Sequence, residues 1–131
     1  MQKNFILLAA SLLGMLAVIL GAFGAHGLEK LLEEPMQQRF HTGVEYQFYH
    51  TSALLALGLL YLHDPNKWLR YAAYAFIFGI IVFSGSLYLY VLTANRNFGM
   101  ITPVGGSSFI LGWILMWIGV WHYKDSDCMR K

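Results

Sequence analysis

The stretch FILLAASLLGMLAVILGAFGA, residues 5–25, contains 21 residues and no ionisable side chain. A helix needs about 20 predominantly apolar residues to cross about 30 Å of hydrocarbon, so this stretch predicts a membrane-spanning helix. It ends in the small residues of a possible cleavage site, but its apolar run is longer than the core of a secretory signal peptide. We therefore expect a span that is retained in the mature protein.

Three further apolar segments of comparable length follow, at residues 42–62, 68–92 and 104–123. The chain of 131 residues is 57% hydrophobic and 12% charged, which is too apolar for a soluble domain. Backbone groups in lipid must form hydrogen bonds within the chain, and no segment shows the alternating pattern of a barrel strand. The sequence therefore predicts a single all-α domain, residues 1–131, folded as an antiparallel four-helix transmembrane bundle.

The basic residues predict an orientation for this bundle. With four spans, both termini share one side of the membrane, and that side holds six basic residues: Lys3, Lys67, Arg70, Lys124, Arg130 and Lys131. The opposite side holds three: Lys30, Arg39 and Arg96. The positive-inside rule then predicts cytoplasmic termini and a cytoplasmic tail at residues 124–131. The net charge of +2, with no basic patch, gives no reason to expect nucleic acid as a partner.

A short amphipathic helix is predicted at residues 28–40, between the first two spans. Leu28, Leu31 and Leu32 recur at helical spacing, and glutamates occupy the opposite face. Pro35 should end this helix and is also well placed in the first turn of the next one. The pattern fits a simple connector with a solvated acidic face, and it also fits a segment that senses lipid or docks on a partner.

Small residues predict how the helices pack, because apolar attraction between helices is weak in lipid. In the first span they recur every three or four residues, at Ala10, Gly14, Ala17, Gly21 and Gly24. The same spacing in the second span turns Tyr46 and His50 inward. In the fourth span, Trp113, Trp117 and Trp121 recur every four residues on a face away from the glycines, so they should contact lipid or a second protomer.

Polar residues gather toward the outer ends of the predicted spans, and HTGVEYQFYH (41–50) is the richest stretch. We expect His50, at the depth of Ser84, to form a hydrogen bond with Tyr46, Ser84 or Ser86. Glu45 could face water, pair with His41 or bind a ligand. The candidate outer-leaflet polar cluster comprises His26, His41, Glu45, Tyr46, His50, Ser84, Ser86, Pro103, Gly105, Gly106 and Ser107.

Two readings of this polar cluster remain open. The serine, tyrosine and histidine side chains could simply fasten the helices, or they could surround a pocket for a lipid headgroup or quinone. Pro103 to Ser107 begins a predicted helix whose free amide groups suit a ligand oxygen. A metal site is not expected, because the histidines and Glu45 do not share one helical face.

Four motifs resemble those of the family of small bacterial inner-membrane proteins catalogued as domain of unknown function 423, which has a distant animal relative called transmembrane protein 256. They are GAFGAHGL (21–28), TGVEYQFYH (42–50), FSGSLYL (83–89) and ITPVGG (101–106). The resemblance covers nearly the whole chain. It implies a compact four-span protein of the bacterial plasma membrane, and it supplies no activity, substrate or catalytic residue.

The sequence alone favours a non-enzymatic function: an accessory or packing subunit that binds another membrane protein or a second copy of itself. A small-solute or proton permease is disfavoured, because the inner halves of the spans offer almost no polar path. An enzyme using His50 or His26 on haem or another cofactor ranks last, because no nucleophile, carboxylate pair or phosphate loop is evident. We therefore expect no catalytic residue and no cofactor.

Overall fold

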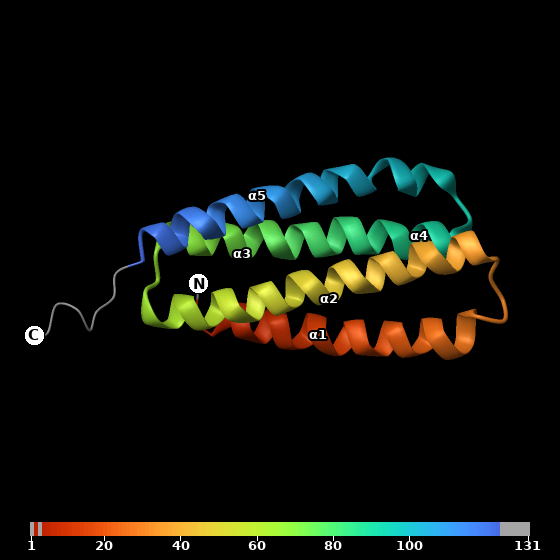
Figure 1. The fold of residues 1–131 in the computed structure, drawn as a ribbon, viewed down its shortest axis with the longest axis horizontal. Helices are drawn as coiled ribbons and strands as arrows, with labels where there is room; N and C mark the ends of the chain where they lie inside the picture. Colours follow the sequence, from red (N-terminus) through yellow and green to blue (C-terminus); the bar gives the residue numbers. More distant parts are fainter. Residues whose placement is uncertain (1, 3, 124–131) are drawn as a thin grey trace, which may run out of the picture.

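The computed structural model describes residue 2 and residues 4–123, and the regular elements of this part of the chain are all helices, with no strand (Figure 1). The helices are α1 (Phe5–Phe23), α2 (Glu34–His63), α3 (Lys67–Gly79), α4 (Gly85–Thr93) and α5 (Thr102–Trp121). Two π-helical turns, η1 (Gly24–Leu28) and η2 (Ile80–Ser84), extend α1 and join α3 to α4, and a 3-10 turn, η3 (Arg96–Met100), precedes α5. The predicted all-helical fold is confirmed.

Local chemistry explains where these helices begin and end. Pro35 lies in the first turn of α2, as predicted, where its missing N–H costs no hydrogen bond. Asn66 caps α3 by accepting a hydrogen bond from the Leu69 N–H at 3.0 Å, and its amide also donates to the Gly119 carbonyl of α5 at 3.2 Å. Ala94 ends α4 because its φ of 54° lies in the left-handed region, where a helix cannot continue.

The predicted connector helix at residues 28–40 is wrong as a separate element. Leu28 ends η1, the chain turns over the next residues, and Glu34 already begins α2. The Gln37 amide holds this turn by donating to the carbonyl oxygens of Glu29 and Leu32, at 2.8 and 2.7 Å. Two of the three leucines that define the predicted apolar face, Leu28 and Leu32, pack against the rest of the chain. Their apolar side chains are therefore wholly or partly buried without a separate surface helix.

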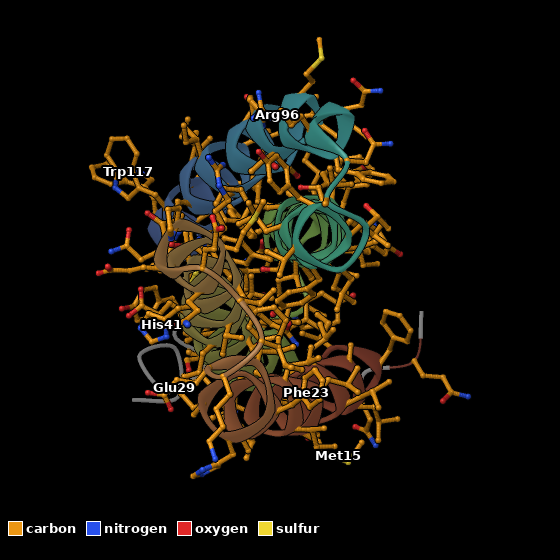
Figure 2. All side chains as sticks on the ribbon, turned by 90° about the vertical axis from the view of Figure 1, so that its right-hand side faces the viewer. Met15, Phe23, Glu29, His41, Arg96 and Trp117 are labelled. Atoms are coloured by element: carbon orange, nitrogen blue, oxygen red, sulfur yellow. The ribbon has the colours of Figure 1, made fainter. Side chains whose placement is uncertain are left out.

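Three helices are long and apolar enough to cross a membrane, judged by length and composition: Phe5–Leu28, Lys67–Thr93 and Arg96–Trp121. α2, which contains the predicted span 42–62, does not join them, because polar residues in its first half lower its hydropathy. The tail at 124–131 and Lys3, on which the predicted orientation partly depends, lie outside the described residues. Met15 on α1 and Trp117 on α5 project outward from the ribbon (Figure 2).

The small-residue faces lie where the helices meet, as the spacing predicts. A Cβ built on Gly21 would lie 3.3 Å from Val44 of α2, and one built on Gly24 would lie 2.7 Å from the Phe40 ring. On α5, a Cβ on Gly112 would lie 2.6 Å from the Phe76 ring of α3. Close approach of backbones gives these helices the van der Waals contact that the hydrophobic effect does not supply in lipid.

Candidate functional site

His50 lies in the middle of α2 and is 6% exposed. Its Nδ1 lies 2.8 Å from the carbonyl oxygen of Tyr46, one turn earlier, and its Nε2 accepts a hydrogen bond from the Trp113 indole N–H at 3.1 Å. Because a carbonyl only accepts, Nδ1 carries the proton and the ring is neutral. Both ring nitrogens are therefore occupied within the chain.

Aromatic rings enclose the His50 imidazole. The Phe109 ring stacks on it, with centroids 3.6 Å apart and planes 9° apart, and the Phe76 ring lies at 5.7 Å. The Tyr46 ring lies nearly parallel to the imidazole, with centroids 6.0 Å apart, and it also lies 6.4 Å from the Phe109 ring. An imidazole in such surroundings is held in place by packing as well as by its two hydrogen bonds, so it is poorly placed to move or to take a ligand.

Gln47, three residues before His50, ties three helices together. Its amide donates to the Leu13 carbonyl of α1 at 2.9 Å, and its Oε1 accepts from the Tyr88 hydroxyl of α4 at 2.7 Å. The Ser84 hydroxyl donates to the Gly43 carbonyl of α2 at 2.6 Å. We call His50, Trp113, Gln47, Tyr88 and Ser84 the interhelix network, because each of its bonds except that to Tyr46 joins different helical segments.

A second set of polar contacts fastens α5 to α4 and α3. The hydroxyls of Ser86 and Thr102 share a hydrogen bond of 2.6 Å, and Ser108 donates to the Ala75 carbonyl at 2.7 Å. Among the described residues, Thr51 Oγ1 is the buried side-chain polar atom without a partner. Nearly every buried polar side chain in this part of the chain is thus used in a tie between helices or to the backbone.

The structure does not bring the residues of the predicted polar cluster into one pocket. His50, Ser84 and Ser86 are buried, and each binds a different partner. His41 and Glu45 form a pair at 3.0 Å on the surface, which realises one of the three alternatives for Glu45. The remaining members are placed as follows: His26, Pro103 and Ser107 are exposed, Tyr46 is 40% exposed, Gly106 is half-buried, and Gly105 is buried against Phe83.

The predicted partners of His50 need a correction. Ser84 and Ser86 bind elsewhere, and the Tyr46 contact comes from its backbone carbonyl. Ser84 lies level with Gly43, seven residues before His50, which is about 10 Å along a helix. The reason is that α2 begins at Glu34, eight residues before the predicted span 42–62, so His50 lies farther from the helix end than the span predicts.

Sequence reasoning did not identify Gln47, Tyr88, Phe109 or Trp113 as members of the site. Gln47 lies on the same helical face as Gly43 and His50, at intervals of four and three residues, and this spacing was an available signal. Trp113 was expected to face lipid or another protomer. It is 48% exposed, but its N–H turns inward to His50.

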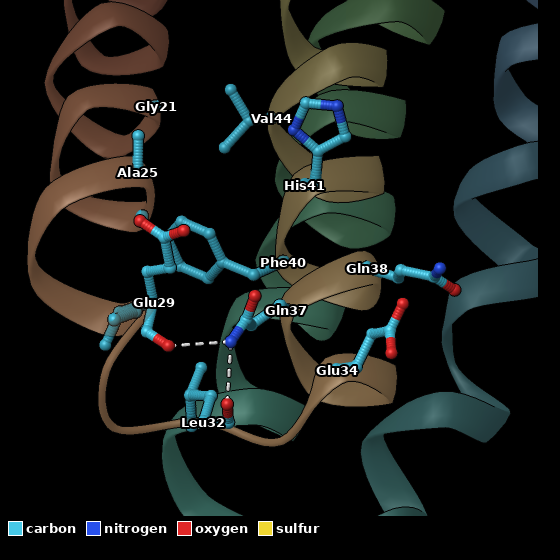
Figure 3. Close-up of a pocket in the computed structure, with 12 residues that line it drawn as sticks. Gly21, Ala25, Glu29, Leu32, Glu34, Gln37, Gln38, Phe40, His41 and Val44 are labelled. Atoms are coloured by element: carbon cyan, nitrogen blue, oxygen red, sulfur yellow. Dashed lines mark hydrogen bonds between the residues drawn. The ribbon is translucent and has the colours of Figure 1, made fainter.

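A groove lies elsewhere, where the end of α1 and η1 face the first turns of α2. This end groove has a volume of about 520 Å³. Figure 3 shows Gly21, Ala25 and Glu29 on one side and His41 and Val44 on the other. Of the predicted cluster, His41 alone lines the groove. The described residues contain no group of three or more histidine, cysteine or acidic side chains able to hold a metal ion.

These features define an integral membrane protein with an all-helical fold and a buried network of hydrogen bonds between helices. The family model described as "Protein of unknown function (DUF423)" matches residues 20–106. The chain belongs to this family, as its motifs predict.

The sequences of several relatives align with this chain over nearly their full length. A UPF0382 membrane protein of Haemophilus influenzae is 43% identical over 124 residues, which cover 95% of this chain and 99% of that protein. The UPF0382 inner membrane protein YgdD of Escherichia coli is 39% identical, with 95% of each chain covered. A UPF0382 membrane protein of Staphylococcus saprophyticus is 43% identical over 90% of this chain and 97% of that protein. No solved structure matches the chain.

Proposed function

We propose that this protein is a non-enzymatic accessory or packing subunit of the bacterial plasma membrane. The observation that carries the proposal is the interhelix network. His50 uses both ring nitrogens, and Gln47 uses its amide and its carbonyl oxygen, on partners within the chain. Side chains so occupied stabilise a rigid shape, whereas a general base or a cofactor ligand needs a free nitrogen or oxygen facing its substrate.

The proposed topology is an antiparallel four-helix transmembrane bundle with cytoplasmic termini. α2 has 30 residues, which is long enough to cross a bilayer, and it packs against α1 and α3. Its polar side chains do not contradict a span, because Gln47, His50 and Thr51 are buried against other helices. Polar residues inside membranes face the interior of a bundle in this way. The six-to-three distribution of basic residues supports cytoplasmic termini.

The packing of the interior argues against a permease. Ile6, Leu54, Leu57, Leu69 and Phe76 are each 0% exposed and belong to one apolar core. A path for an ion or polar solute needs polar or water-lined groups along its length. A layer of fully buried aliphatic and aromatic side chains between the helices interrupts any such path.

The outward face of α5 is the proposed contact with a second copy or another membrane protein. Trp117 and Trp121 are 69% and 78% exposed, and together with Ile118 and His122 they line a hollow of about 270 Å³. Exposed aromatic side chains around a concave surface are typical of sites that receive an anchor side chain from a partner.

Extraction into native nanodiscs with chemical cross-linking tests this proposal. We expect a defined oligomer or a stoichiometric partner, and we expect its yield to fall strongly in the double variant Trp117→Ala, Trp121→Ala. The matched control is Leu8→Ala, at a 65% exposed position on α1. A protein that is always a lone monomer at native abundance would contradict the accessory role, and equal losses in the control would contradict the assignment to α5.

A further inference from the structure

The end groove combines an apolar wall with a polar rim. Leu28, Phe40 and Val44 contribute the wall, and Leu28 and Phe40 belong to a buried cluster. Glu29, Glu34 and Gln38 contribute polar side chains on the exposed side. A soluble ion or metabolite would gain little from such a wall. An amphiphile gains from both parts of the groove, because its chain contacts the wall while its headgroup stays at the rim.

The charge of the rim selects the headgroup. Two carboxylates, Glu29 and Glu34, line the groove, and neither lysine nor arginine lines it among the described residues. His41 also lines it, but this imidazole lies 3.0 Å from the Glu45 carboxylate, which offsets any positive charge it carries. Arg39, on the same turn of α2, points to the Tyr90 ring, with 4.6 Å between its guanidinium carbon and the ring centroid. The groove therefore favours a cation.

Gln37 adds a hydrogen-bond acceptor to this negative rim. Its amide nitrogen is used twice, on the carbonyls of Glu29 and Leu32, and both bonds are drawn in Figure 3. These bonds fix the side chain and leave its carbonyl oxygen without a partner among the described residues. Carboxylates beside a fixed amide oxygen accept hydrogen bonds from the N–H groups of a primary ammonium. A trimethylated nitrogen has no N–H and cannot donate these hydrogen bonds.

The position of the groove identifies the source of the ligand. One side of the groove is formed by residues 21–29, where the candidate span Phe5–Leu28 ends, so the groove opens at the boundary between hydrocarbon and water. A bilayer lipid can reach this place with its headgroup at the rim and its chain along the apolar wall. We propose that the end groove binds a phospholipid with an ethanolamine headgroup, whose primary ammonium contacts Glu29 and Glu34.

Native mass spectrometry of the full chain released from nanodiscs tests the proposal. The nanodiscs contain equal parts of phosphatidylethanolamine, phosphatidylcholine and phosphatidylglycerol. We expect retained phosphatidylethanolamine to exceed each of the other two lipids. In the double variant Glu29→Gln, Glu34→Gln, this preference should fall by about fivefold to tenfold, because two partly exposed charge pairs are lost.

Matched controls separate the groove from the rest of the surface. Glu33→Gln removes a carboxylate from the same turn that does not line the groove, and the lipid preference should stay unchanged. Ala25→Trp fills the groove from an exposed position and should abolish retention of the lipid, whereas Leu31→Trp, at a 77% exposed position outside the groove, should not. Thermal unfolding in detergent verifies that each variant is folded.

Three outcomes would overturn the proposal. Equal retention of the three lipids would remove the selection by charge. An unchanged preference in the double glutamate variant would place the selecting groups elsewhere. Displacement of the lipid by millimolar ethanolamine alone would show that the apolar wall contributes nothing and that the ligand is a soluble amine. None of these results would affect the accessory role, which rests on the interhelix network and on α5.

Discussion

The hydrogen bond between Trp113 and His50 gives the sharpest test of the structure. Trp113→Phe keeps an aromatic ring but removes the N–H that donates to His50 Nε2 at 3.1 Å. The acceptor then stays buried without a donor, because His50 is 6% exposed and its other nitrogen is held by the Tyr46 carbonyl. A buried acceptor that loses its partner costs about 1–3 kcal/mol.

The membrane environment lowers the expected loss of stability. Hydrogen bonds between membrane helices contribute about 0.6 kcal/mol on average and about 1.7 at most, because the unfolded chain in lipid also finds partners. Part of the Trp113 ring faces outward, since the residue is 48% exposed, so its truncation to phenylalanine removes little buried area. We therefore expect Trp113→Phe to lower the free energy of unfolding by about 1–2 kcal/mol.

Reversible unfolding in mixed micelles, followed by far-ultraviolet circular dichroism, measures this change. A double-mutant cycle with His50→Phe isolates the pair and should give a coupling free energy of at least about 0.6 kcal/mol. Trp117→Phe is the matched control, one turn away and 69% exposed, and should cost less than about 0.5 kcal/mol. A coupling within about 0.3 kcal/mol of zero would refute the bond as a source of stability.

Three further predictions use the same chain. Gly105→Ala should cost about 2–3 kcal/mol in micelle unfolding, because its Cβ would lie 2.7 Å from a backbone Cα of η2. Gly106→Ala should leave the free energy of unfolding unchanged, since its Cβ would meet no atom closer than 3.8 Å. Equal losses of stability in the Gly105 and Gly106 variants would contradict this packing. Tyr88→Phe should lower the free energy of unfolding by about 1 kcal/mol, because it removes the hydroxyl that donates to Gln47. An unchanged unfolding midpoint would exclude that hydrogen bond. A membrane-impermeant maleimide should label Cys128, the single cysteine, in inside-out vesicles only; labelling of intact cells would reverse the proposed topology.

The sequence predicted the helical features that depend on local composition and spacing. The uncharged run at residues 5–25 lies within a helix long and apolar enough to span a membrane, and Pro35 lies in the first turn of α2. Ala10 and Ala17 are buried on the side of α1 that meets α2, as the interval of seven residues predicts. The family motifs were equally local, and the family they indicate is confirmed.

The tertiary structure decided which polar groups meet. His50 and Trp113 are 63 residues apart, and Gln47 and Tyr88 are 41 apart, so their pairing depends on the rotation and axial register of whole helices. The π-helical turn η2 affects both quantities for Tyr88, because it widens the helix locally and turns the residues of α4 that follow it. Because α2 begins at Glu34, eight residues before the expected span, Ser84 lies level with Gly43 and not with His50.

Hydropathy and small-residue spacing are properties of one segment, so the sequence by itself determined that this is a helical membrane protein with close-packed faces. A hydrogen bond between helices and a groove between two helix ends are properties of several segments at once. Only the tertiary structure decided that the end groove forms, because its walls come from α1, η1 and α2 and meet once these helices have packed.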